Sequence, residues 1–255
     1  MKQVILVIFV FINFLHTSNA REPIVFVTND YEPYVIEENS VVKGIFPDII
    51  RAIFHELNIE VEFRFQPWKR GEMTVKKGEA FATFPYLITE QRSEDFYFSD
   101  PVIYFLPKFL YKNKKFPSGF TWEKLSDFQQ YRIGGVQGYW YQNSFQTAGL
   151  NVNYVTRDIQ NIKMLMNERI HFTLLPELVG QILIQKVYPN QVSAFSFAKK
   201  PESIDTFRLM VSRKYPNVKE LIEKFNKRLR KIKSNGTYQN IFQKYEVPKE
   251  YEAYQ

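Results

Sequence analysis

Cysteine is absent from all 255 residues. Its absence excludes disulfide bonds, thiol catalysis, thiolate metal sites and a lipid-modified cysteine. Histidine is almost as scarce, and only His55 and His171 follow residue 20. Because these two lie in unrelated segments, they give little support to a shared metal site or a catalytic triad. We therefore expect neither a metal nor a cofactor.

Motifs of nucleotide binding and nucleophilic catalysis are missing too. The chain has no G-x-S-x-G, P-loop or G-x-G-x-x-G pattern. Glu94 and Asp95 are acidic neighbours, which indicates a polar turn and not the separated carboxylate pair of glycoside hydrolysis. We predict no catalytic residues, and a protein that is not an enzyme.

Long apolar runs are limited to the N-terminus. Lys2 precedes an apolar stretch over residues 4–15, and the small residue Ala20 follows at cleavage spacing. A core of about a dozen apolar residues is shorter than the roughly 20 that span a bilayer. We therefore predict a signal peptide over residues 1–20, cut after Ala20, and export to the periplasm. A retained anchor, or release from a Gram-positive cell, is the alternative.

Positive charge exceeds negative charge, with 34 Lys and Arg against 27 Asp and Glu. Much of the excess falls in KELIEKFNKRLRKIKSNG, residues 219–236, where apolar residues recur at helical spacing. The basic residues then form the outer face of an amphipathic helix. In an exported protein this indicates a solvated face, so we expect no nucleic-acid partner.

Aromatic residues are abundant. Phe, Tyr and Trp make up 17% of the chain, with 24, 16 and 3 residues respectively. This exceeds what a core usually needs, so we expect some rings to line a ligand pocket.

Strand and helix patterns alternate along the chain. A buried strand is predicted over residues 23–30, PIVFVTND, and a second strand over residues 59–66, IEVEFRFQ, where apolar and charged residues alternate. Between them, residues 46–58, FPDIIRAIFHELN, have apolar residues at helical spacing. VIEENSVVKG, residues 35–44, indicates a hairpin. The pattern predicts an α/β protein with largely parallel sheets. Without a flexible linker, two lobes would be joined by ordered strands.

A lone arginine, Arg92, lies in the apolar and acidic stretch FPYLITEQRSEDFYFSDP, residues 84–101. It is either a solvated surface charge or a group that holds an anion, for which the planar guanidinium fork is well suited. The glycines of IGGVQG, ending at Gly138, follow a predicted strand and precede a helix. Backbone N–H groups there can hold an anion, although a plain tight turn explains the glycines equally well.

Four motifs in order resemble the bacterial extracellular solute-binding proteins of family 3, the periplasmic amino-acid receptors of ABC importers. They are YEPYVIEENSVVKGIFPDIIRAI, GEAFATFPYLITEQRSEDFYFSDP, YRIGGVQG and NGTYQNIFQKY. The resemblance implies a two-lobed type II periplasmic-binding fold, with a mixed, mostly parallel sheet in each lobe. Lobe 1 would comprise residues 21–107 and 203–255, and lobe 2 residues 108–202. Hinge strands are expected near residues 103–112 and 195–210.

The resemblance also implies a binding site. In the family, the arginine of a T-x-x-R motif receives the ligand's α-carboxylate, and Thr89 to Arg92 match that motif. Tyr31 matches the aromatic residue of the first loop, and the ring beneath the ligand falls at or next to Trp68. Tyr86, in the predicted strand EAFATFPYL that leads into the motif, is a further candidate for ligand binding. Ordinary core packing is the alternative reading of the rings.

Three positions depart from the family pattern. Tyr139 follows Gly138 where the family usually has a small hydroxyl residue, and Leu87 replaces another hydroxyl. The acid nearest to the family's ammonium-binding aspartate is Glu177, which could equally be a helix-start carboxylate. These changes predict an unusually aromatic pocket, for an aromatic, cationic or non-standard amino acid or a small carboxylate.

The leading hypothesis is a monomer that binds a small solute and delivers it to an inner-membrane ABC permease by lobe closure. One alternative is a dehydratase-like enzyme of the same fold, with Arg92 anchoring a substrate and Glu177 moving a proton. The other is a ligand-sensing module that signals through a membrane partner.

Overall fold

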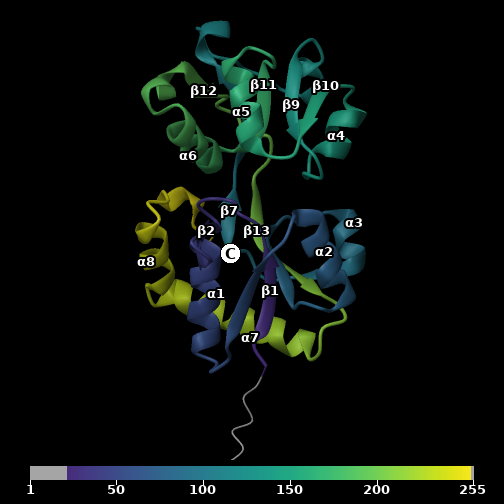
Figure 1. Cartoon of the computed structure of the whole chain (residues 1–255), viewed down its shortest axis with the longest axis vertical. Helices are drawn as coiled ribbons and strands as arrows, with labels where there is room; N and C mark the ends of the chain where they lie inside the picture. The colour runs from purple at the N-terminus through teal and green to yellow at the C-terminus, as the bar shows by residue number, and fades with distance from the viewer. Residues whose placement is uncertain (1–21, 254–255) are drawn as a thin grey trace, which may run out of the picture.

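The computed structural model describes residues 22–253. The predicted signal peptide, residues 1–20, lies outside them. The chain forms two α/β lobes, one above the other in Figure 1, joined by two extended segments. None of the helices in residues 22–253 is long and apolar enough to cross a membrane.

A six-stranded sheet forms the centre of the lower lobe. Its strands are, in spatial order, β4 (Val61–Phe65), β1 (Ile24–Thr28), β5 (Ala82–Tyr86), β13 (Asp205–Ser212) and β6 (Phe96–Phe98), with β7 (Ile103–Phe105) also paired to β13. β1 runs parallel to β4 and β5, whereas β13 is antiparallel to its neighbours. The predicted hairpin forms separately from β2 (Ile36–Glu38) and β3 (Val41–Lys43).

The upper lobe contains a five-stranded sheet. Its strands are, in spatial order, β10 (Asn151–Val155), β9 (Arg132–Val136), β11 (Phe172–Pro176), β8 (Pro107–Lys112) and β12 (Phe195–Phe197). β9 is parallel to β10 and β11, and β8 is antiparallel to β11 and β12.

The predicted mixed α/β architecture is confirmed, but parallel pairing is limited to three strands in each sheet. β8 and β13, the strands that bring the chain into each lobe, are antiparallel to every strand with which they pair. Each enters its sheet from the end that faces the other lobe. It therefore runs opposite to the strands whose carboxyl ends point to that end.

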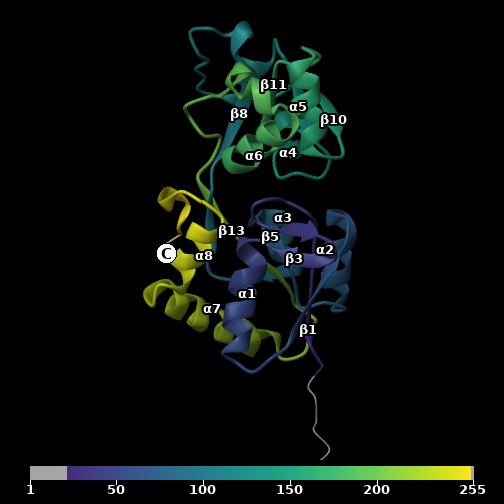
Figure 2. The same ribbon diagram turned by 60° about the vertical axis from the view of Figure 1, so that its left-hand side comes forward.

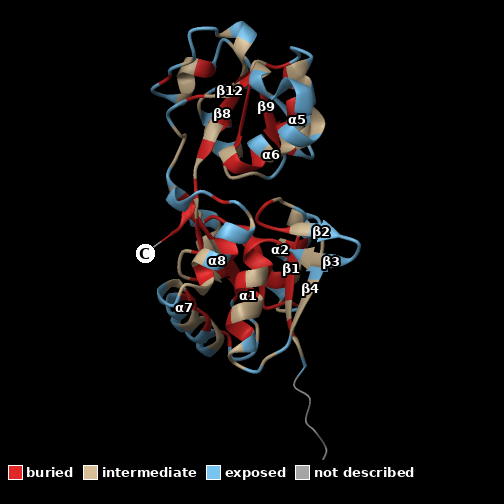
Figure 3. Cartoon of the chain, turned by 90° about the vertical axis from the view of Figure 1, so that its left-hand side faces the viewer, coloured by how far each residue is buried: buried red, intermediate tan, exposed pale blue. Residues whose placement is uncertain are grey.

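Helices flank both sheets. The lower lobe has α1 (Ile45–His55), α2 (Trp68–Lys77), α3 (Glu90–Asp95), α7 (Val218–Ser234) and α8 (Thr237–Lys244), and the upper lobe has α4 (Gln142–Thr147), α5 (Asp158–Met166) and α6 (Glu177–Val187). Short 3-10 helices are η1 (Asn113–Lys115), η2 (Leu125–Phe128), η3 (Pro189–Ala194) and η4 (Lys249–Tyr251). Figure 3 shows buried residues gathered inside each lobe and exposed ones on outer helix faces such as that of α7, as its pattern predicts.

The chain crosses between the lobes twice, at residue 106 and over residues 198–204, side by side in Figure 2. At the crossing, β7 pairs with the start of β13, with Asp205 opposite Phe105. β7 and β8 flank the first crossing, and β12 and β13 flank the second, whereas residues 198–204 themselves lie outside any strand. The hinge strands predicted near residues 103–112 and 195–210 fall in these regions. The lobe limits at residues 107 and 203 stay a prediction.

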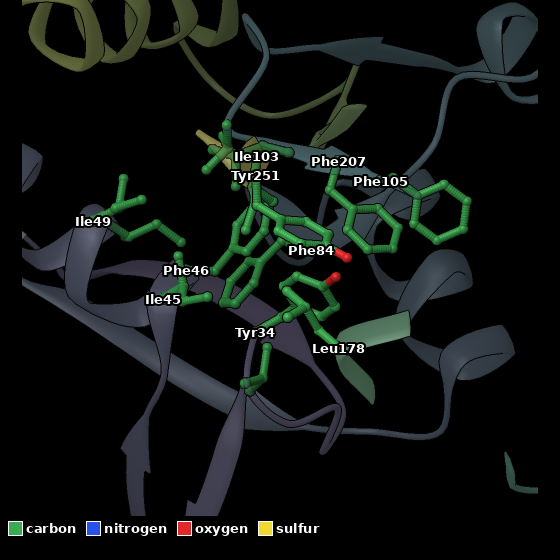
Figure 4. Packing of buried hydrophobic residues seen from close by; sticks show 14 of the residues in the cluster. Tyr34, Ile45, Phe46, Ile49, Phe84, Ile103, Phe105, Leu178, Phe207 and Tyr251 are labelled. Carbon is green, nitrogen blue, oxygen red and sulfur yellow. The ribbon is translucent and has the colours of Figure 1, made fainter. Parts of the chain in front are cut away.

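Apolar packing continues across the hinge. Tyr34 and Phe207 of the lower lobe belong to the same buried cluster as Leu178 of α6 in the upper lobe (Figure 4). The rings of Tyr34 and Phe207 meet edge to face, with centroids 5.0 Å apart. One buried cluster thus contains residues of both lobes.

Candidate ligand-binding cleft

A cavity of about 680 Å³ lies between the lobes. Its size is within the range of small-molecule sites. The lower lobe supplies Tyr31, Trp68, Lys69, Glu72, Pro85, Tyr86, Leu87, Gln91, Arg92, Asp95, Phe96 and Phe207, and the upper lobe supplies Gln137, Gly138, Tyr139, Trp140 and Gln142. The strands β1, β5 and β9 end at this cleft. Ligands of open α/β sheets bind at such carboxyl ends.

Six of the eight residues that the sequence suggests for ligand binding line this cavity. They are Tyr31, Trp68, Tyr86, Arg92, Gly138 and Tyr139. The other two, Thr89 and Glu177, are not among its lining residues. The structure thus brings together positions that lie more than a hundred residues apart in the chain.

Arg92 is held at the cavity wall by its own helix and strand. The hydroxyl of Thr89 caps α3 and accepts the backbone N–H of Arg92 at 3.2 Å. The guanidinium donates to the carbonyl of Leu87 at 3.2 Å and lies 4.7 Å from the centroid of the Tyr86 ring. Thr89 therefore positions Arg92 by fixing the start of its helix.

Most donors of Arg92 remain available. Among the described residues, the Leu87 carbonyl is its one hydrogen-bond acceptor, and a guanidinium has five N–H groups. The carboxylate of Glu72 lies 3.9 Å from Nε, too far for a direct hydrogen bond. The side chain is 18% exposed, so it is partly desolvated and still open to the cavity. The arrangement suits an anion that replaces water at the guanidinium.

Aromatic rings from both lobes meet across the cleft. Tyr31 contacts Trp68 in its own lobe and Tyr139 in the other, with centroids 6.0 and 6.4 Å apart. Trp140 stacks on Tyr139 at 5.5 Å and meets Phe105 edge to face at 4.7 Å. These rings exclude water, which strengthens electrostatic interactions at the cavity.

The hydroxyl of Tyr139 is already engaged. It donates to Oδ2 of Asp158 at 2.6 Å, and Asp158 is 5% exposed. Burial raises the pKa of Asp158 to about 6, although the hydrogen bond from Tyr139 acts in the opposite direction. Burial and the Asp158 charge also raise the pKa values of Tyr31 and Tyr139 well above their usual value. Tyr139 therefore presents a ring, not a free hydroxyl, at the cleft.

Gly138 forms the turn before Tyr139. Its φ of 80° lies in the left-handed region, which glycine adopts without strain. Its N–H donates to the side-chain oxygen of Gln142 at 2.9 Å. Gln142 and Gln137, both lining residues, supply the polar amide groups of the upper lobe.

A comparison with protein families matches residues 24–248 to the bacterial extracellular solute-binding proteins, family 3. The chain belongs to this family. The resemblance carried by its four motifs is thereby confirmed.

Individual relatives agree with the family assignment. The arginine-binding periplasmic protein of Mannheimia haemolytica is 25% identical over 247 residues, covering 90% of this chain and 92% of that protein. A solved ancestral arginine-binding protein bound to arginine has a TM-score of 0.74 at 21% identity, covering 89% of this chain and 99% of that one. An ancestral amino-acid-binding protein, a precursor of cyclohexadienyl dehydratase, scores 0.73 at 17% identity, with coverages of 88% and 95%. These likenesses confirm the predicted type II periplasmic-binding fold.

Glu177 of this family 3 protein lies at the hinge. It begins α6, and its Oε2 atom lies 2.5 Å from Nζ of Lys108 and 3.5 Å from the hydroxyl of Tyr251. Because it is paired there and does not line the cavity, its position fits the helix-start reading.

Several lining residues were missed by the sequence analysis. Glu72 follows Trp68 by four positions on α2, so helical spacing could have placed both on one face. Trp140 and Gln142 follow Gly138 closely and could have been included with its turn. The bond between Tyr139 and Asp158 had no sequence signal, because it joins two separate segments.

Metal ligands are not assembled within residues 22–253. No group of three or more His, Asp or Glu side chains there is placed to hold a metal ion.

Proposed function

We propose that this family 3 protein binds a free amino acid or a related small carboxylate between its lobes, with Arg92 on the carboxylate. The observation that carries the proposal is the position of Arg92: partly desolvated, fixed by Thr89 and Tyr86, and facing the cavity with spare donors. A planar carboxylate can accept two parallel hydrogen bonds from one guanidinium.

The remaining walls suit a compact ligand with an apolar or cationic part. Trp68 and Tyr31 offer ring faces, and Glu72 offers a carboxylate on the same side. The arginine-binding relative is consistent with an amino-acid ligand. Tyr31 and Tyr139, whose rings already meet across the cleft, would cover such a ligand, and the lobes would open and close by rotation about β7 and β13.

Delivery to an inner-membrane ABC permease is the proposed outcome of binding. Membership of the solute-binding family and the periplasmic relative support this role and a periplasmic location. The N-terminal signal peptide, with cleavage after Ala20, belongs to the same proposal, as does a monomeric state.

The placement of Glu177 argues against the proton-transfer role that the dehydratase-like alternative gives it. A dehydratase-like reaction would need a proton-transfer group at the ligand, within about 3 Å of the reacting atom. Glu177, the acid considered for that role, is paired with Lys108 away from the cavity lining. A ligand-sensing module would use the same cleft. It would differ from a transport protein in the membrane partner that it contacts.

A ligand screen tests the proposal. At one hundred times its dissociation constant, a bound amino acid should stabilise the protein by about 2.7 kcal/mol, measured by thermal unfolding. Trp68 and Trp140 line the cleft, so the same ligand should change their fluorescence. Trp122→Phe serves as the control, because Trp122 packs in the upper-lobe core and its removal should leave the response intact. If no amino acid or small carboxylate shifts either signal, the proposal fails; chemical conversion of a hit would instead indicate an enzyme.

Replacing Glu177 with glutamine should leave ligand affinity nearly intact. Because Glu177 pairs with Lys108 at the hinge, we expect the dissociation constant to change by less than about tenfold, or about 1.4 kcal/mol. Isothermal titration with a hit from the screen measures this, and Gln142→Ala, a change in the cavity lining, is the comparison. A larger loss in Glu177→Gln than in Gln142→Ala would show that Glu177 reaches the ligand.

A further inference from the structure

We propose that the upper lobe carries a second binding site, for an anion with a phosphate group, at the end of its sheet farthest from the hinge. A cavity of about 220 Å³ lies there, and it shares no lining residue with the cleft between the lobes. Its charged and titratable lining residues are Lys112, Lys114, Lys115, Arg132, His171 and Glu168.

Strand register brings three of these basic residues together. Tyr111 and Ile133 are both in register with Phe172 on β11. The neighbouring residues Lys112, Arg132 and His171 therefore lie at one end of three adjacent strands, β8, β9 and β11. The short helix η1 then adds Lys114 and Lys115 beyond the end of β8.

The charge balance of the cavity is strongly positive. Four Lys and Arg side chains face one carboxylate, which leaves a net +3 with His171 neutral. Glu168 is bonded to Lys112 at 2.9 Å, and this hydrogen bond, followed by the charges of Lys112, Lys114 and Lys115, holds the pKa of Glu168 below its usual value. The carboxylate is thus neutralised locally, and the excess positive charge has no counterpart among the lining residues.

Donors at the site are fixed and partly unused. Arg132 donates from Nε to the carbonyl of Arg169 at 2.8 Å and from Nη2 to that of Glu168 at 2.9 Å, which holds its guanidinium plane. Within residues 22–253, its Nη1 group and the ammonium groups of Lys114 and Lys115 donate no hydrogen bond. A phosphate group offers the several acceptor oxygens that such a set requires.

His171 contributes a directed donor. Its Nδ1 atom accepts the backbone N–H of Arg132 at 2.9 Å, so the neutral ring carries its proton on Nε2. Burial, and then the charges of Arg132 and Lys115, lower the pKa of His171. An anion bound among these cations would remove part of that repulsion and raise the pKa again.

The cavity volume limits the size of the ligand. One water takes about 30 Å³ in the liquid, so 220 Å³ holds roughly seven waters. A phosphate ion or a small phosphomonoester fits this space. The same chemistry is offered by a free phosphate and by a lipid headgroup, because Lys114 and Lys115 are exposed.

Titration of the purified protein with inorganic phosphate, followed by NMR of the histidine rings at constant ionic strength, tests the site. We expect saturable shifts and a raised pKa for His171, while the His55 signals on α1 stay in place. Lys114→Ala combined with Lys115→Ala should weaken phosphate binding by about tenfold or more. The control pair, Lys219→Ala with Lys227→Ala on exposed positions of α7, should bind phosphate as the wild type does. Equal shifts of both histidines, or unchanged affinity in the Lys114 and Lys115 variant, would overturn the proposal.

Co-sedimentation with phosphatidylcholine vesicles, with and without phosphatidic acid, separates the two sources of phosphate. A lipid headgroup is supported if the protein co-sediments with vesicles that contain phosphatidic acid. Inorganic phosphate should then release the protein, and the Lys114 and Lys115 variant should not co-sediment. Binding of inorganic phosphate or glycerol phosphate without vesicle capture supports a free anion. Binding of none of these probes overturns the site. Amino-acid binding in the cleft should be unchanged in the variant, so this result is independent of the proposed function.

Discussion

Arg92→Ala is expected to weaken binding of a carboxylate ligand by roughly 30- to 4,000-fold, measured by isothermal titration. Truncating one partner of a desolvated, hydrogen-bonded charge pair costs about 2–5 kcal/mol, and each 1.4 kcal/mol is tenfold in affinity. The side chain is 18% exposed and faces the cavity, so the ligand carboxylate would be left without its cation. Arg92→Lys should recover only part of the loss, because an ammonium cannot form two parallel hydrogen bonds.

Arg70→Ala is the matched control. Arg70 is exposed on α2 and does not line the cavity, so ligand affinity should stay within the error of the measurement. The free energy of unfolding of ligand-free Arg92→Ala should be close to that of the wild type, since the Arg92 side chain donates a single hydrogen bond among the described residues. Equal affinities of Arg92→Ala and wild type would show that the carboxylate binds elsewhere.

Asp158→Asn is expected to gain stability relative to the wild type by about 3 kcal/mol as the pH rises from about 3 to about 7. Burial raises the pKa of Asp158 from 3.8 to about 6, a shift of roughly two units at 1.36 kcal/mol each. Because the folded state holds the proton more tightly, the stabilising contribution of Asp158 is complete only well below the unfolded pKa of 3.8. It is lost as the pH rises from there through 6, where the buried carboxylate becomes charged.

Denaturant unfolding of the wild type and of Asp158→Asn at several pH values measures the difference between their free energies of unfolding. The contributions of the other titrating groups are the same in both proteins and cancel from this difference. Tyr139→Phe removes the hydrogen bond to Asp158 and should destabilise the wild type at neutral pH by about 1–3 kcal/mol. The same Tyr139→Phe substitution should reduce the free energy of unfolding by less in the Asp158→Asn variant. Tyr154→Phe, at an exposed ring of the same lobe, is the control and should have little effect. A stability difference that does not vary with pH would contradict the assignment of a raised pKa to Asp158.

Local patterns were sufficient for much of the fold. The apolar stripe of α1 and the alternation in β4 depend on residues a few positions apart, so each element can be predicted from its own segment. The direction of β8 and β13 could not, because it depends on where the chain re-enters each sheet. Parallel pairing is therefore confined to β1, β4 and β5 in one sheet and to β9, β10 and β11 in the other.

The candidate site likewise contains residues that the sequence predicts and residues whose contacts only the tertiary structure shows. Arg92 stands out in the sequence, because one arginine in an apolar and acidic stretch within a T-x-x-R motif needs a local explanation. Glu177 could be placed by position as an ammonium-binding acid, but its pairing with Lys108 depends on how β8 and α6 meet at the hinge. Position in sequence does not determine the direction of a side chain, which follows from packing.

The sequence by itself determined the family, the α/β architecture and the arginine on which the binding proposal rests, because motif order and periodicity are properties of neighbouring residues. Only the tertiary structure decided which rings face the cleft and that Tyr139 is bonded to Asp158, 19 positions away. It also decided that Lys112, Arg132 and His171 meet at one sheet end, because strands adjacent in space are distant in the chain. Long-range strand pairing and core packing set these contacts, and no local pattern encodes them.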